Sequence, residues 1–203
     1  MVTPPDAGYL FDEDPVFGVP FNGEHRAYFL RILNAHEMAN DGVGACLSRW
    51  RLLNPLRFRN RVLTKIDGQV FEFGTLGLLY RSNKLMYDLG TETLGRQFTG
   101  KPVVGSLVDS GIKLKVSPVL LTTWGDWLAA HPNTTVLDPN NGFYPADLYA
   151  PEWDTQSIYY PLRQQPETSF LVWGKSDRLP EKSEVLGLIV GGEAWANPAE
   201  VLR

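Results

Sequence analysis

The segment PVFGVPFNGEHRAYFLRIL, residues 15–33, sets the structural pattern of this chain. Apolar residues flank Asn22-Gly23, a pair that tolerates the positive φ of a tight hairpin turn. The segment EVLGLIVGGEAWANPAEVL, residues 184–202, repeats this arrangement with Gly191-Gly192 at the turn. The two segments therefore predict one type of β-hairpin used twice. Because the second copy ends almost where it begins, we expect the chain to be truncated at its C-terminus.

Between the two hairpins the sequence mostly predicts further short strands. Residues 57–66 and 69–74 flank Asp67-Gly68, which is a strong hairpin turn pair. Residues 75–88 predict another strand pair that turns around Ser82-Asn83. Residues 112–116 alternate apolar side chains with lysine, as in a half-exposed strand.

Helical patterns are few and short. Residues 123–131 predict a helix that Thr122 or Thr123 caps and that Pro132 ends. A short helix is expected at 32–39, and residues 140–166 predict a long ordered loop. We expect a β-rich α+β fold, a single domain of short antiparallel strands and hairpins with one or two short helices. This domain would span residues 15–203, after an N-terminal extension at 1–14.

The charge of the chain is uneven. Its 203 residues carry a net charge of −4, which argues against nucleic-acid binding by bulk charge. Six of the 19 basic residues nevertheless lie between Arg49 and Lys65, where no acidic residue occurs. Three interpretations of this stretch stand side by side. It could be a strand with a solvated face, or a polyanion or membrane patch in which Trp50 and Phe58 stack or insert. It could also be a sequence foreign to the fold.

Localisation signals are absent from the sequence. The one cysteine, Cys46, cannot form an internal disulfide, and no apolar run reaches the length of a membrane span. The first fifteen residues lack the basic region and apolar core of a signal peptide. A periplasmic or extracellular location would require that the N-terminus also be truncated.

The motif HEMAND, residues 36–41, is the first candidate for chemistry. A zinc-protease helix needs a second histidine four residues after His36, and Asn40 occupies that position. His36 can then contribute one ligand to a composite metal site. Alternatively, His36 and Asp41 are structural and hydrogen-bond the backbone near a helix end.

The motif MYDLGTET, residues 86–93, is the second candidate. Tyr87, Asp88 and Glu92 could serve a metal or a general base. Asp88 and Gly90 also suit a simple turn.

Aromatic side chains are a third candidate. They could line a ligand platform or belong to the core, and these are Trp124, Trp127, Trp153, Tyr159, Tyr160 and Trp173.

Five segments together resemble one family. They are GEHRAYFLRILNAHEMAND (23–41), DGQVFEFGTLGLLYRSNKLMYDLGTETLGRQFTG (67–100), PVVGSL (102–107), TTWGDWLAAHPNTTVL (122–137) and EVLGLIVGGEAWA (184–196). The series is similar to the prokaryotic domain-of-unknown-function family DUF3179 and covers nearly the whole chain. Two single departures stand in the first segment, where Phe29 replaces the usual proline and Ala35 the usual tryptophan.

The largest departure is at RLLNPLRFRNRVL, residues 51–63. Here the family usually has Tyr-Cys-x-x-Cys-Gly-Ser and an apolar strand. Codons permitted for this stretch, shifted by one base, read Gly-Tyr-(TGA)-Thr-Pro-Cys-Gly-Ser-Gly-Ile-Val-Phe, and TGA can encode selenocysteine. Our hypothesis is that residues 44–65 are out of frame in a fragment of the family protein.

The resemblance implies thiol or selenol redox chemistry, or a soft-metal site, in intact members. The residues that match its motifs are His36 and Glu37 in the first, and Tyr87, Asp88, Glu92 and Gln97 in the second. We assign catalytic roles to His36, Glu37, Tyr87 and Asp88, ligand binding to Glu92, Gln97 and Trp124, and a possible metal contact to His36. The partner would be a thiol or a small molecule.

Both family cysteines are missing from this chain, so the sequence predicts that the chemistry is lost. The alternative is a non-catalytic module that binds a ligand on its aromatic loops. A third interpretation is polyanion binding through the stretch from Arg49 to Lys65.

Overall fold

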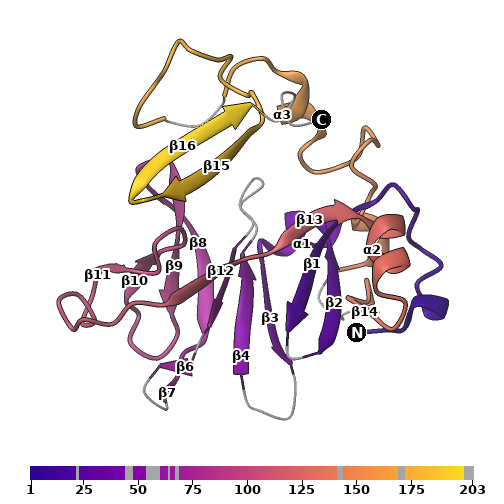
Figure 1. The fold of residues 1–203 in the computed structure, drawn as a ribbon, viewed down its shortest axis with the longest axis horizontal. Coiled ribbons are helices and arrows are strands. Elements are labelled where there is room, and N and C mark those ends of the chain that lie inside the picture. Colours follow the sequence, from indigo (N-terminus) through magenta and orange to yellow (C-terminus); the bar gives the residue numbers. More distant parts are fainter. Residues whose placement is uncertain are drawn as a thin grey trace. The chain divides into compact units, whose positions relative to one another are not determined.

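A computed structural model describes residues 1–21, 23–43, 48–53, 60–63, 65–66, 69–140, 144–168 and 172–198. The chain divides into two compact units, residues 1–160 and 161–203, which are described separately (Figure 1). Strands dominate and the helices are short, so the predicted β-rich α+β class is confirmed.

The first sheet is built on the N-terminal hairpin. β1 (Pro15–Phe21) pairs antiparallel with β2 (Glu24–Phe29), and Gly23 in the connecting turn has φ +81°. β13 (Leu120–Thr123) adds antiparallel to the outer edge of β1, and β14 (Thr135–Val136) adds parallel to β2. The hairpin predicted for residues 15–33 is therefore confirmed.

Two helices accompany this sheet. α2 (Trp124–Ala130) begins after Thr123, whose side chain accepts a hydrogen bond from the Asp126 N–H, as the sequence predicts. α1 (Leu30–His36) follows β2 without a break and ends three residues earlier than the predicted helix at 32–39. It ends there because Glu37 adopts the left-handed conformation, with φ 60°.

The second sheet has the strand order β12-β5-β4-β3. It consists of β3 (Met38–Val43), β4 (Ser48–Leu53), β5 (Asn60–Leu63) and β12 (Lys115–Pro118). The described residues of the basic stretch thus lie in the two inner strands, except for Lys65, which lies in β6 (Lys65–Ile66). The strand predicted at 112–116 begins at Lys115 instead, because the N–H of Leu114 donates to the Gly100 carbonyl (2.9 Å) and not to a strand of this sheet.

The third sheet has the order β11-β10-β9-β8. β8 (Phe73–Tyr80) and β9 (Asn83–Asp88) form its hairpin, followed by β10 (Leu94–Arg96) and β11 (Pro102–Val104). The turn is Arg81-Ser82, both with positive φ, one residue earlier than predicted. β6 (Lys65–Ile66) and β7 (Gln69–Val70) pair around the predicted turn at 67–68, which lies outside the described residues.

Irregular backbone and a second hairpin make up the rest. Short helical segments occur at η1 (Pro4–Asp6), η2 (Ala146–Leu148) and α3 (Tyr160–Gln164). The loop predicted at 140–166 therefore contains η2 and α3. In the second unit, β15 (Val185–Val190) pairs with β16 (Glu193–Pro198) around Gly191-Gly192, the predicted turn.

The N-terminal segment 1–14 packs onto the first sheet. Val2 exchanges backbone hydrogen bonds with Val136, and Ala7 lies in the core cluster. Asp14, only 1% exposed, lies 3.2 Å from the Arg31 guanidinium of α1. Burial raises the pKa of the Asp14 carboxyl. These contacts make the segment part of the fold.

Gly18 of β1 packs closely against Trp127 of α2. A Cβ placed on Gly18 would lie 2.3 Å from two atoms of the Trp127 indole. Trp127 is 1% exposed, and its Nε1–H donates to Thr134 Oγ1 (2.9 Å), which satisfies the buried indole. Gly18 therefore allows α2 to approach β1 directly.

We expect Gly18→Ala to lower the free energy of unfolding by about 1–3 kcal/mol, because the added methyl overlaps the buried indole. Gly77→Ala is the matched control, since an added Cβ there meets nothing within 4 Å. It should change stability by less than about 1 kcal/mol. Urea unfolding followed by tryptophan fluorescence measures both, and equal stabilities would contradict the packing argument.

Candidate functional site

The candidate site lies at the C-terminal end of α1, around His36. The His36 Nε2 is 2.6 Å from the Tyr149 hydroxyl, and the ring of Tyr144 lies 4.9 Å from the imidazole, centroid to centroid. Burial lowers the pKa of His36 below its usual value. The imidazole is therefore neutral at pH 7, which is the form that acts as a base or a metal ligand.

Glu37 joins α1 to the third sheet. Its Oε2 accepts a hydrogen bond from Thr75 Oγ1 of β8 (2.9 Å) and forms an ion pair with Lys84 of β9. Glu37 also adopts the left-handed conformation, which favours glycine or asparagine at a helix end. The carboxylate of Glu37 is thus held by the third sheet while its backbone ends α1.

Residues 144–159 supply more polar groups to the same place. Glu152 accepts a hydrogen bond from the Asn34 amide of α1, and Asn34 is 8% exposed. Burial raises the pKa of the Tyr159 phenol, and the carboxylates of Glu37 and Glu152 raise it further. The loop thus brings tyrosines and a second carboxylate to the His36-Glu37 pair.

The start of β3 connects this site to β4. Met38, directly after Glu37, pairs in antiparallel register with Leu53, the last residue of β4. Position 53 therefore lies across one strand spacing from the residue that follows His36-Glu37. Side chains of β4 and β5 lie outside the described residues.

A family model described as a protein of unknown function (DUF3179) matches residues 1–203. The chain belongs to this family. The resemblance inferred from the sequence motifs is therefore confirmed. No curated protein and no solved structure matches the chain significantly.

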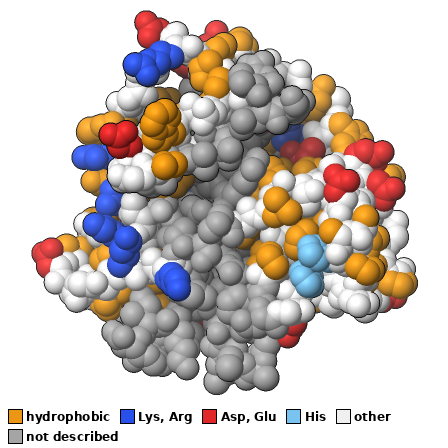
Figure 2. Space-filling view, viewed as in Figure 1, with side chains coloured by type: hydrophobic (Ala, Val, Ile, Leu, Met, Phe, Trp, Pro, Cys, Tyr) orange, Lys and Arg blue, Asp and Glu red, His pale blue; other side chains and the backbone are white. Residues whose placement is uncertain are grey.

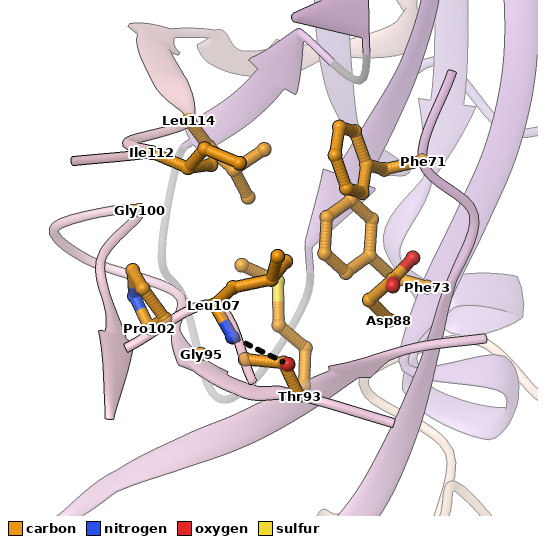
Figure 3. Close-up of a pocket in the computed structure, with 11 residues that line it drawn as sticks. Phe71, Phe73, Asp88, Thr93, Gly95, Gly100, Pro102, Leu107, Ile112 and Leu114 are labelled. Atoms are coloured by element: carbon orange, nitrogen blue, oxygen red, sulfur yellow. Dashed lines mark hydrogen bonds between the residues drawn. The ribbon is translucent and has the colours of Figure 1, made fainter. Parts of the chain in front are cut away.

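The second motif of this DUF3179 chain forms a turn rather than part of the His36 site. Asp88, 3% exposed, accepts a hydrogen bond from the Thr91 N–H (2.7 Å). Asp88 also lines a pocket of about 30 Å³, which holds one or two water molecules at most. In Figure 3 the side chains of Phe71 and Phe73 line this pocket, and the Leu107 N–H donates to Thr93 Oγ1 (3.3 Å). This is a gap in an apolar core cluster.

The remaining predicted residues are spread over the fold. Tyr87 packs its ring against the backbone of Gly74, and Glu92 is exposed. Gln97 is 3% exposed, and its Oε1 has no hydrogen-bond partner. Trp124 is 4% exposed in the core cluster with Trp127, so its ring lies in the protein interior.

Within the described ranges, no three His, Cys, Asp or Glu side chains come together in a way that could hold a metal ion. Figure 2 shows histidine at the surface of one face, and the rings of His25 and His131 stack on each other at 3.9 Å. These two histidines also contact Trp127, so they belong to the packing around α2.

Sequence reasoning missed most partners of His36 and Glu37. Tyr149, Glu152, Lys84 and Thr75 were not singled out, although Tyr159 was named among the aromatic residues. The density of tyrosine and proline in 140–166 was the available indication, because ordered loops of this kind often carry binding groups.

None of the helices described is long and apolar enough to cross a membrane.

The pKa of His36 generates a prediction about pH and stability. The folded state holds His36 below the unfolded value of about 6.5, so the unfolded chain binds the extra proton between the two values. The stability is therefore fully present above about pH 6.5 and falls as the pH drops toward the folded pKa. Proton NMR titration of the imidazole measures the folded pKa directly.

His36→Gln should remove part of this loss of stability on acidification. His131→Gln is the matched control, because burial and His25 also lower the pKa of His131, so its effect should be separate and additive. A His36 pKa at or above about 6.5 would contradict the described environment.

Proposed function

We propose that intact DUF3179 chains carry a cysteine-pair site beside His36-Glu37, for thiol or selenol redox chemistry or a soft metal ion, and that this chain has lost it. The observation that carries the proposal is the pairing of Met38 with Leu53. In the shifted reading, position 53 takes the TGA codon and position 56 the cysteine. The first chalcogen would then lie beside β3, the strand that begins at Met38, directly after Glu37.

The environment of His36 suits this chemistry. A neutral imidazole can accept the proton of a thiol or selenol, and Glu37, held by Thr75 and Lys84, keeps the end of α1 in place. In a redox cycle the two thiolates form an internal disulfide. The two electrons pass to a disulfide of the partner, which leaves as two thiols after taking up two protons.

This chain has leucine at both positions, Leu53 and Leu56. Cys46 lies outside the described residues, and the described residues offer no metal-binding cluster. We therefore expect no thiol–disulfide activity and no stoichiometric soft-metal binding by the chain as it stands.

The test is a repaired protein in which residues 51–62 are replaced by Gly-Tyr-Cys-Thr-Pro-Cys-Gly-Ser-Gly-Ile-Val-Phe. We expect it to form an internal disulfide on mild oxidation or to bind one Cu(I) or Zn(II) ion per chain, while the unrepaired chain does neither. Thiol titration, mass spectrometry and metal analysis provide the readouts.

The matched control is the repaired protein with His36→Ala. If His36 serves the cysteine pair, this variant should slow disulfide exchange or weaken metal binding while keeping both thiols titratable. A folded repaired protein with three free thiols (the introduced pair and Cys46), no disulfide and no bound metal would contradict the proposal.

The frame hypothesis has its own measurement, the DNA sequence encoding residues 39–68 with its flanks. We expect a shifted frame that reads Tyr-(Cys or TGA)-x-x-Cys-Gly-Ser. A clean frame without this reading would mean that the arginines of β4 and β5 are native.

A second candidate is a module that binds a ligand without catalysis. The observation in its favour is the group of tyrosines around His36, which are Tyr144, Tyr149 and Tyr159. This function would survive in the present chain, whereas cysteine chemistry would not. Polyanion binding through the stretch from Arg49 to Lys65 is the third candidate, and it would weaken steeply with added salt.

A further inference from the structure

The hydrogen bond between His36 and Tyr149 determines which ring nitrogen of His36 carries the hydrogen. A neutral imidazole has one N–H donor and one bare nitrogen, and the partner of one nitrogen decides the state of the other. His36 Nε2 lies 2.6 Å from the Tyr149 hydroxyl. Either the hydroxyl donates to Nε2, or Nε2–H donates to the hydroxyl oxygen. The two arrangements leave opposite groups on Nδ1.

The length of this bond assigns the donor. Hydroxyl donors give heavy-atom distances of about 2.5–3.0 Å, whereas N–H···O bonds begin at about 2.7 Å. The separation of 2.6 Å between Nε2 and the hydroxyl falls only in the hydroxyl range, so Tyr149 donates and Nε2 accepts. The hydrogen of the neutral imidazole therefore lies on Nδ1.

Packing holds the Tyr149 hydroxyl in this position. Tyr149 is 4% exposed and belongs to the same core cluster as Ile32 of α1. Its N–H donates to the Ala146 carbonyl of η2 (3.2 Å), which fixes its backbone. A buried hydroxyl has to donate to an acceptor within the protein, and Nε2 is an acceptor at the right distance. Both ends of the bond are thus held by packed elements.

This assignment separates the two chemistries of the proposed function. A histidine that binds a metal needs one bare nitrogen for the ion, and its other nitrogen donates to an acceptor. His36 has a different arrangement, because its bare nitrogen receives the hydroxyl of Tyr149. Its Nδ1–H suits a thiolate or selenolate instead, since a hydrogen bond to the charged form of a group favours that form.

We propose that Tyr149 is a positioning residue that keeps the hydrogen of neutral His36 on Nδ1, so that His36 serves the cysteine pair as a hydrogen-bond donor to a thiolate or selenolate rather than as a metal ligand. This role rests on the cysteine-pair site of the proposed function and selects redox chemistry from its two alternatives. A proton that His36 takes up goes to Nε2, where the same hydroxyl accepts the new N–H. Tyr149 thus supports both protonation states of the imidazole.

The first measurement uses the unrepaired chain and needs no cysteine pair. Nitrogen-15 NMR of the histidine side chains at about pH 8, above the ordinary pKa of about 6.5, reports the neutral tautomer. We expect the shift of a protonated nitrogen for His36 Nδ1 and that of a bare nitrogen for Nε2. Tyr149→Phe removes the hydroxyl and keeps the ring, so it should move the hydrogen at least partly to Nε2.

Tyr144→Phe is the matched control, because the Tyr144 ring also lies beside the imidazole, 4.9 Å between centroids. It should leave the tautomer of His36 unchanged. Circular dichroism checks that both variants fold.

The second measurement uses the repaired protein with glutathione disulfide as the oxidant. Tyr149→Phe should slow formation of the internal disulfide by roughly tenfold, because the thiolate loses a charge-assisted hydrogen bond. The same variant should strengthen Zn(II) binding, since Nδ1 can then be bare, and Tyr144→Phe should do neither. Mass spectrometry and metal titration provide the readouts.

The role of Tyr149 is overturned by an Nε2–H tautomer in the unrepaired chain, or by Tyr149→Phe with an unchanged tautomer or an unchanged rate. A repaired protein that binds a metal ion but forms no disulfide also overturns it. A repaired protein that folds and does neither overturns the proposed function. The tautomer measurement distinguishes these failures, because it does not depend on the cysteine pair.

Discussion

The Glu37 carboxylate is the interaction on which the arrangement of the first unit depends. Glu37 stands where α1, which continues from the first sheet, gives way to β3 of the second sheet. Its side chain binds Thr75 and Lys84 of the third sheet. One residue therefore connects three sheets, and its left-handed backbone turns the chain from helix into strand at that point.

This position explains why His36 can be a site residue. The imidazole is fixed from one side by the end of α1 and from the other by Tyr149, which is 113 residues further along the chain. Tyr149 is itself buried in the core cluster that includes Ile32 of α1, so both anchors are packed. A group presented in this way keeps its orientation, which is a requirement for proton transfer or ligand binding.

Local patterns predicted the local structure well. The first hairpin and α2 follow from turn pairs, caps and apolar spacing, which are all contained in short windows. The turn at Arg81-Ser82 was placed one residue late because Asn83 is the more typical turn residue, yet Asn83 pairs with Tyr80 in the sheet. The partners of His36 and Glu37 could not be predicted, since they are set by contacts between distant segments.

The predicted site residues show the same difference between local patterns and contacts of distant segments. His36 and Glu37 were found because their motif is contiguous, whereas Trp124 was assigned to ligand binding although it lies in the core cluster. The sequence around a tryptophan at the start of a helix is the same whether its ring packs in the core or binds a ligand. Only the packing of α2 on β1, which depends on Gly18 more than one hundred residues earlier, distinguishes them.

The described residues of the basic stretch lie mostly in inner strands. Residues 49–53 belong to β4 and residues 60–63 to β5, the two inner strands of a four-stranded sheet, each paired on both sides. Inner strands are usually apolar on at least one face, because both neighbours and any covering layer exclude water. Arg49, Arg51 and Arg61 stand in these two strands, whereas the shifted reading places Ile, Val and Phe at positions 60–62 of β5. The frame hypothesis would therefore address both the charge in these strands and the missing first cysteine at position 53, which pairs with Met38.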